Sequence, residues 1–209
     1  MDDDEAYEGQ RRTAYHEAGH AIAAIKTPHG SVKYIDICDR NVDDESGGTF
    51  ASSPDADDAF RIYAGPWAEE KFNNPDEAID RDGVLGCLRT NEDDWTDFQH
   101  ALGNDVSPTA WTQMQEAALG IGTAPREYRP SSAWHDKATS VLVKAWDDGD
   151  IQQLAEQMMA RRKEIQLPNG QSIVREDTRD RWNAKDYCEA PRDGSGLVGP
   201  PPPIDQTTP

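Results

Sequence analysis

The sequence lacks a long apolar run and has few basic residues. Its longest apolar run, Ala21 to Ile25, is far shorter than the roughly 20 residues that a membrane-spanning helix needs, and no apolar segment follows a basic N-terminal start. Lys and Arg number 21 against 40 Asp and Glu, which gives a formal charge of −19. Such an acidic surface disfavours binding to nucleic acid or to an anionic membrane, because both require cationic patches. The composition therefore predicts a cytoplasmic protein whose partners are peptides or small molecules.

Cysteine is also scarce. The three cysteines, Cys38, Cys87 and Cys188, are odd in number, widely spaced and without a Cys-x-x-Cys pair. This pattern predicts a reducing compartment and no disulfide framework, with the cysteines serving as small apolar residues. The phosphate-binding pattern G-x-x-x-x-G-K-[ST] is absent as well, so no ATP binding is expected.

The length of 209 residues suits one domain with tails. We expect an acidic N-terminal segment at 1–12, interpreted as a plain tail rather than as the charge-favoured first turn of a helix. A domain is predicted over 13–175, followed by a charged extension at 176–190. Six prolines in residues 191–209, four of them consecutive, exclude helix and central strand there and predict a disordered tail.

Between the tails, hydrophobic periodicity predicts a mainly helical domain with a small β-sheet, which is an α+β fold. The β-forming residues from Val32 to Ile37 predict a strand, and Gly47 to Phe50 a second one. Gly65 and Pro66 are expected to bend or interrupt the second helix. The predicted helices are Thr13 to Lys26, Ala56 to Phe72, Glu92 to Leu102 with Thr90 or Asn91 as its cap, Ala110 to Leu119, Ser131 to Trp146 and Ile151 to Ile165.

One motif carries chemistry: His16, Glu17 and His20 form an H-E-x-x-H sequence inside a predicted helix. Residues at i and i+4 lie on one helix face, so the two imidazoles can bind a single Zn²⁺ at about 2.0–2.1 Å. Glu17 sits beside that face, where its carboxylate can take a proton from a water that zinc activates and pass it to a leaving amine. The motif therefore predicts a zinc site with Glu17 as general base.

A tetrahedral catalytic zinc needs a third protein ligand and an open position for water. No H-x-x-G-x-x-H extension follows the motif, which excludes the astacin and matrix-protease arrangement. Carboxylates must therefore supply the third ligand. The candidates are Glu69, Glu70, Asp93, Asp94 and Asp97.

The segment from Thr13 to Ala23 resembles the zinc-binding helix of the FtsH family of ATP-dependent metalloproteases. Three further landmarks follow in the family's order. The predicted strand at Val32 to Ile37, with the glycines that follow it, is similar to the strand and loop that edge the substrate cleft. Ala64 to Glu70 resembles a glycine-rich segment that ends in Ala-Glu-Glu, and Asp94 begins a segment like the helix that carries the third ligand. The resemblance spans residues 13–173 and implies a zincin-like helical protease domain with one zinc per chain.

The family places apolar residues one, four, seven and eight positions after its metal-binding aspartate. Counted from Asp94, these positions hold Trp95, Phe98, Ala101 and Leu102, whereas counted from Asp97 the last two hold Asn104 and Asp105. The resemblance therefore favours Asp94 as the third ligand, with Asp97 as the alternative. Glu69 and Glu70 are expected to orient a zinc ligand or to cap a buried interaction rather than to bind the metal.

The chain departs from the family in having neither membrane anchors nor the ATPase motor that unfolds substrates. We therefore expect a stand-alone zinc-dependent metalloendopeptidase, of a kind found in bacteria or phages, that hydrolyses unfolded or flexible polypeptides. An edge strand would pair with the main chain of the substrate. The residues expected to bind substrate are Val32, Tyr34, Ile35, Ile37, Gly47 and Gly48.

Other functions stay open at this point. The chain could be a catalytically silent zinc-binding interaction module, or an interaction protein in which the motif is incidental. A repressor-cleaving peptidase of the ImmA/IrrE kind carries the same motif in a small chain, although the Ala-Gly pair inside the motif and the later Ala-Glu-Glu favour the FtsH-like interpretation. FtsH-like protease domains form hexameric rings, so a homo-oligomer is a further expectation, although the charge of −19 per subunit makes close ring packing electrostatically costly. Because the chain lacks a motor, an adaptor that hands over the substrate is another expected partner.

Overall fold

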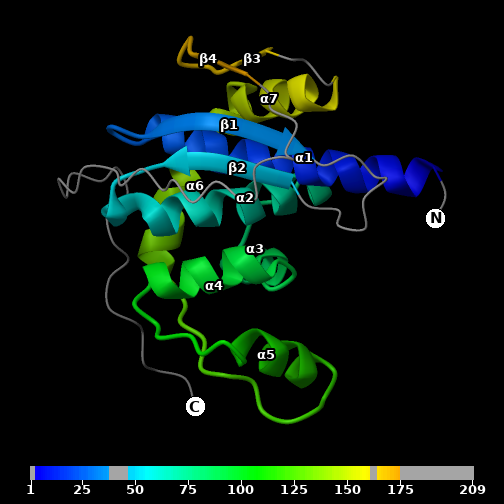
Figure 1. The fold of residues 1–209 in the computed structure, drawn as a ribbon, viewed down its shortest axis with the longest axis vertical. Helices are drawn as coiled ribbons and strands as arrows, with labels where there is room; N and C mark the ends of the chain where they lie inside the picture. The colour runs from blue at the N-terminus through cyan, green and yellow to red at the C-terminus, as the bar shows by residue number, and fades with distance from the viewer. Residues whose placement is uncertain (1–2, 38–46, 161–163, 175–209) are drawn as a thin grey trace.

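The computed structural model describes residues 3–37, 47–160 and 164–174 (Figure 1). It confirms a mainly helical α+β fold with small antiparallel sheets. The predicted extension at 176–190 and tail at 191–209 lie outside the described residues, as do Cys38 and Cys188. The helices are α1 (Asp3–Lys26), α2 (Asp58–Asn73), α3 (Arg81–Leu88), α4 (Glu92–Ala101), α5 (Ala110–Ala118), α6 (Ser132–Asp147) and α7 (Asp150–Met159), with a 3₁₀ turn at Asp55–Asp57. The strands are β1 (Ser31–Ile37), β2 (Gly47–Ser52), β3 (Glu164–Gln166) and β4 (Ser172–Val174).

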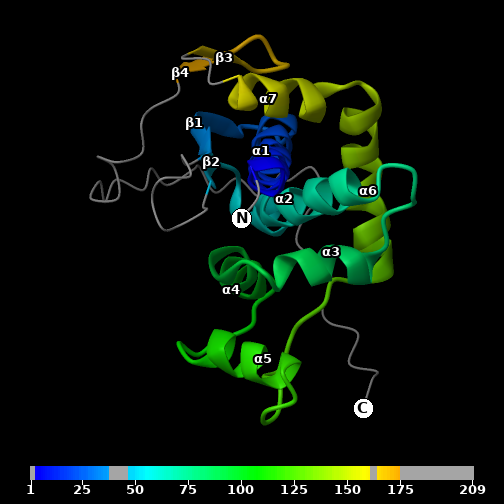
Figure 2. The ribbon, with the colours of Figure 1, turned by 90° about the vertical axis from the view of Figure 1, so that its right-hand side faces the viewer.

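Helices α1 and α2 form the centre of the fold (Figures 1 and 2). They approach closely because Gly19 of α1 has no side chain: a Cβ there would lie 2.2 Å from the backbone oxygen of Ala64. Along α2, first Gly65 lies against His20 and then Phe72 stacks on Tyr15 at 4.5 Å between ring centroids, so the two helices run antiparallel. The core around them contains the largest fully buried side chains, which include Ile22, Phe60, Tyr63, Trp67, Leu85, Trp95 and Phe98.

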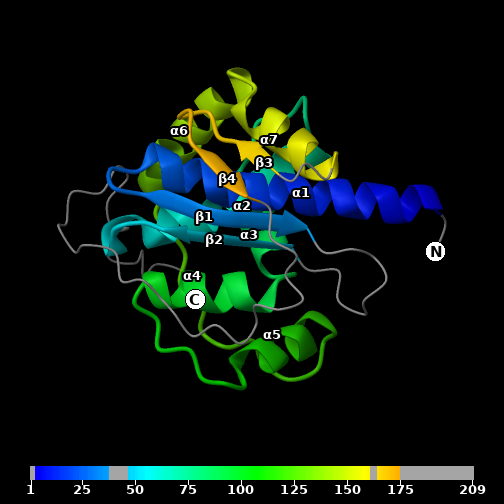
Figure 3. The same cartoon turned by 45° about the horizontal axis from the view of Figure 1, so that its top comes forward.

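The first sheet covers one side of α1. β1 returns antiparallel to α1 and pairs with β2 in an antiparallel ladder, with an irregularity between Val32 and Tyr34. β2 therefore runs in the same direction as α1, and the hydroxyl of Thr49 donates a hydrogen bond to the backbone oxygen of Glu17 at 3.0 Å. The β3–β4 hairpin lies beside β1, where the Gln171 amide donates to the backbone oxygen of Val32 at 3.4 Å (Figure 3).

Helix α4 lies below the sheet and α2, and α5 lies farther out (Figures 1 and 2). Asn91 caps α4, as predicted, because its side-chain oxygen accepts a hydrogen bond from the backbone N–H of Asp94 at 3.0 Å. The buried side chains of Trp95 and Phe98 fix the inner face of α4, and Trp95 also meets Trp111 of α5. This anchoring sets the position of the first turn of α4, which faces α1.

The N-terminal segment is a correction to the sequence-based prediction. We expected a plain tail over 1–12, but α1 begins at Asp3. The helix therefore extends through most of the segment that we expected to be a tail. Within this segment, Arg11 pairs with Glu8 at 2.9 Å, which adds an i,i+3 contact.

Three other features of the domain also differ from the predictions. Pro66 does not interrupt α2, because the burial of the helix face compensates for the missing backbone hydrogen bond. The last predicted helix ends at Met159, and Ile165 belongs to β3, where the Gln157 side chain exchanges two hydrogen bonds with the backbone of Gln166. Helix α3 was not predicted at all. Across the described ranges, no helix combines the length and apolar character needed to cross a membrane.

Candidate metal centre

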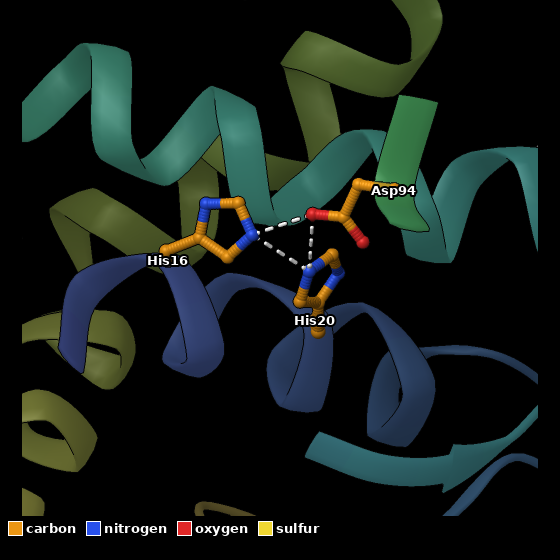
Figure 4. A group of neighbouring side chains, drawn as sticks. All are labelled: His16, His20 and Asp94. Carbon is orange, nitrogen blue, oxygen red and sulfur yellow. Dashed lines mark hydrogen bonds and ion pairs between the residues drawn. The ribbon is translucent and has the colours of Figure 1, made fainter. Parts of the chain in front are cut away.

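Side chains from α1 and α4 bring three ligand atoms together (Figure 4). Nε2 of His16 lies 3.0 Å from Nε2 of His20, because the two residues are one helical turn apart on the same face. Oδ2 of Asp94 lies 2.7 Å from Nε2 of His16 and 3.4 Å from Nε2 of His20. The backbone of α4 begins at its cap just before Asp94, so the carboxylate projects from the first turn toward α1.

The remaining ring nitrogens fix the orientation of both imidazoles. Nδ1 of His20 lies 2.9 Å from the backbone oxygen of Arg61, and since a carbonyl oxygen only accepts, this nitrogen donates. Nδ1 of His16 likewise donates to the Glu69 carboxylate at 2.9 Å. Both Nε2 atoms of the neutral rings therefore carry a lone pair. Partners of this kind are typical of histidines that bind metal.

Three electron-rich atoms thus face one another, namely two imidazole nitrogens and a carboxylate oxygen. Such an arrangement requires a cation between them, either a proton or a metal ion. Burial alone would lower the pKa of His16, but hydrogen bonds with Asp94 and Glu69 outweigh it and raise the pKa of this histidine well above its usual value. Burial opposes ionisation of Asp94 too, yet the neighbouring charge of His20 and the hydrogen bond with His16 hold the pKa of Asp94 well below its usual value.

The geometry fits a metal ion as well as a proton. A tetrahedral zinc with bonds of about 2.0 Å places its ligand atoms about 3.3 Å apart, and the three separations here are 2.7, 3.0 and 3.4 Å. Two imidazoles and one carboxylate form a donor set that binds zinc, and also divalent iron or manganese. His16, His20 and Asp94 are therefore the residues that would hold the metal.

Gly65 of α2 provides the space for the two rings. A Cβ at this position would lie 2.3 Å from Nε2 of His20 and 2.9 Å from Nε2 of His16. Any side chain here would occupy the same volume as the ligand atoms. The sequence analysis considered Gly65 as a bend in a helix and as part of a glycine-rich segment, and its contact with the histidines becomes visible only once α2 is placed on α1.

Glu17 lies beside the three ligand residues. It is 6% exposed, and its Oε2 has no hydrogen-bond partner among the described residues. Burial raises the pKa of Glu17, while the charges of His20 and His16 partly oppose the shift. An unpartnered carboxylate oxygen next to a metal site is the feature that a general base requires.

The other predicted site residues have different surroundings. Asp97 lies one turn beyond Asp94 on α4, is exposed, and is not one of the three converging residues. Glu69 holds His16, whereas Glu70 accepts hydrogen bonds from the Asn74 amide at 3.0 Å and the Cys87 thiol at 3.4 Å. Glu69 thus contacts a candidate ligand, and Glu70 instead links α2 to α3.

The strand residues expected to bind substrate are divided between core and surface. The side chains of Val32, Ile35 and Ile37 are buried, so they cannot contact a substrate. Tyr34 is half-buried and stacks on Phe50 of β2 at 5.3 Å between ring centroids. Gly47 and Gly48 lie in β2, the strand that contacts α1 at Glu17 through Thr49. Of the residues expected to bind substrate, Gly47 and Gly48 therefore belong to the strand that contacts α1 at Glu17.

Comparison with known proteins adds no further identification. The chain matches no family model, no curated protein and no solved structure. The likeness to the FtsH family thus rests on the residues of the sequence alone.

Proposed function

We infer that the chain is a zinc-dependent metallopeptidase that hydrolyses peptide bonds in unfolded or flexible polypeptides. The observation that carries this inference is the convergence of His16, His20 and Asp94, with an unpartnered Glu17 oxygen beside them. The order of these residues in the chain, and the Ala-Glu-Glu segment that contains Glu69, add the resemblance to FtsH-like protease domains.

Each residue has a separate task in this mechanism. When bound, zinc acidifies water and polarises a carbonyl group. The Glu17 carboxylate accepts a proton from the attacking water and delivers it to the amine that leaves when the C–N bond breaks. Burial raises the pKa of Glu17 above its usual value, which strengthens this carboxylate as a proton acceptor. Glu69 and the Arg61 carbonyl hold the imidazoles in position throughout.

The substrate would pair with β2 rather than with β1. β1 has β2 on one side and the β3–β4 hairpin on the other. The far edge of β2 has no strand paired with it among the described residues, and it lies on the side of α4 (Figure 2). An extended peptide added there would form main-chain hydrogen bonds that depend little on sequence.

Replacement of Glu17 by Gln tests the mechanism. We expect Glu17→Gln to bind one zinc per chain and to lose cleavage of unfolded casein, because the amide cannot accept the proton. Glu70→Gln makes the same chemical change on α2 without touching a ligand, so it should keep activity. Full casein cleavage by Glu17→Gln would contradict the mechanism.

One observation favours the alternative of a zinc-binding module without turnover. His16, Glu17 and His20 are each only 6% exposed, which is typical of a structural metal site. This alternative predicts one zinc per chain in both the wild type and Glu17→Gln, and no cleavage by either.

A further inference from the structure

We propose that Arg12 binds a carboxylate group of the substrate on the carboxyl side of the scissile bond. This inference rests on the proposed peptidase function and narrows its substrate class. Arg12 would make the enzyme select peptides with an acidic residue, or a free chain end, close to the cleaved bond.

Arg12 lies on the same face of α1 as the candidate metal ligands. It is one turn before His16 and two turns before His20, at positions i, i+4 and i+8. Its Nε lies 3.6 Å from Oε1 of Glu69, whose other oxygen accepts the hydrogen bond from His16. The guanidinium group therefore lies at the His16 end of the candidate site.

The positive charge of Arg12 is available to a ligand. Its side chain is 52% exposed, and its contact with Glu69 is longer than a hydrogen bond. A contact of this length with a half-exposed guanidinium group is weak, so it does not prevent a second carboxylate from binding. The neighbouring Arg11 differs, because it donates to Glu8 at 2.9 Å and lies over the Phe72 ring at 5.1 Å.

The direction of β2 decides which side of the scissile bond meets Arg12. β2 runs in the same direction as α1 (Figure 1). An added strand pairs slightly more stably in the antiparallel orientation, and a peptide in that orientation runs toward the N-terminus of α1. Residues after the scissile bond then lie over Arg12. One helical turn from His16 to Arg12 covers about 6 Å, which an extended peptide spans in about two residues.

The group recognised is a carboxylate, from either of two sources. It is the side chain of Asp or Glu at the second position after the scissile bond, or the terminal carboxylate of a peptide that ends there. A guanidinium group binds both in the same forked manner. Elsewhere the charge of −19 repels anionic peptides, so this recognition is local and should weaken as salt screens it.

Four fluorescent peptides that differ only at or after this second position test the proposal. One has Glu there within a longer amidated peptide, one has Gln, one ends there as a free acid, and one ends there as an amide. We expect the wild type to prefer Glu over Gln, or acid over amide, by about tenfold in kcat/KM. Arg12→Gln should reduce that ratio to near one, and the matched variant Arg11→Gln should keep it.

Two controls separate this proposal from the proposed function. Binding of the same peptides to Glu17→Gln, followed by fluorescence anisotropy with and without Arg12→Gln, measures the preference without turnover. If no peptide is cleaved, the proposed peptidase function is wrong, but the ratio of affinities for acidic and neutral peptides still tests the role of Arg12. Equal kcat/KM and equal binding of acidic and neutral peptides would overturn the proposal, as would a preference that Arg12→Gln retains.

Discussion

Alanine in place of Gly65 should abolish tight metal binding while the fold remains. The new Cβ would lie 2.3 Å from Nε2 and 2.4 Å from Cε1 of His20. Non-bonded heavy atoms keep about 3.5 Å or more between them, so the His20 ring must move by about 1 Å. Metal–ligand distances hold to within about 0.2 Å, and a displacement of this size therefore removes His20 as a ligand. Loss of an outer partner alone costs about 10–100-fold in metal affinity, so we expect Gly65→Ala to lose about 100-fold or more.

The assay is a zinc titration in competition with a chromophoric chelator, together with thermal unfolding of the metal-free protein. Gly86→Ala is the matched control, because a Cβ at Gly86 of α3 meets no atom within 4 Å. It should bind zinc like the wild type and gain about 0.5–1 kcal/mol of helix stability. Wild-type zinc affinity in a folded Gly65→Ala variant would refute the placement of α2 against the two imidazoles.

Three further outcomes are expected. Gly19→Ala should lower the free energy of unfolding by about 1–3 kcal/mol in urea titrations, because its Cβ would lie 2.2 Å from the Ala64 backbone oxygen and push α1 from α2; unchanged stability would contradict that contact. Glu69→Gln should weaken zinc binding about tenfold, because His16 loses a charged hydrogen-bond acceptor. Equal zinc affinity of Glu69→Gln and Glu70→Gln would contradict the view that only Glu69 supports a metal ligand. Burial lowers the pKa of His135, so its neutral form is favoured in the folded protein, and this preference costs stability as the pH falls below about 6.5. The free energy of unfolding of His135→Gln should therefore depend less steeply on pH between 7.5 and 5.5 than that of the wild type. Parallel curves would contradict a lowered pKa of His135.

Local sequence patterns predicted part of the candidate site, and the family resemblance added the third residue. The spacing of His16 and His20 places them on one helix face whatever the rest of the fold does. The choice of Asp94 over Asp97 came from the resemblance to the FtsH family, and in the structure Asp94 faces the histidines while Trp95 and Phe98 are buried. The cap at Asn91 follows from its side chain alone.

Features that depend on how elements pack were not predictable from the sequence. The proximity of Gly65 to the imidazoles, and the hydrogen bond from His20 to the Arg61 carbonyl, arise from the crossing of α1 and α2. Ile165 has an apolar side chain that fits a helix stripe equally well, but backbone pairing with Ile173 places it in a strand. Tertiary contacts decide such short apolar segments, because periodicity does not distinguish them.

Metal content tests the central claim most directly. Elemental analysis of purified wild type, Asp94→Ala and Asp97→Ala should show one zinc per chain in the wild type and in Asp97→Ala, and a large loss in Asp94→Ala. Asp97→Ala is a matched control because Asp97 lies one turn away on the same helix and outside the converging group. Absence of metal from the wild type, or full zinc content in Asp94→Ala, would contradict the claim that His16, His20 and Asp94 form a metal site.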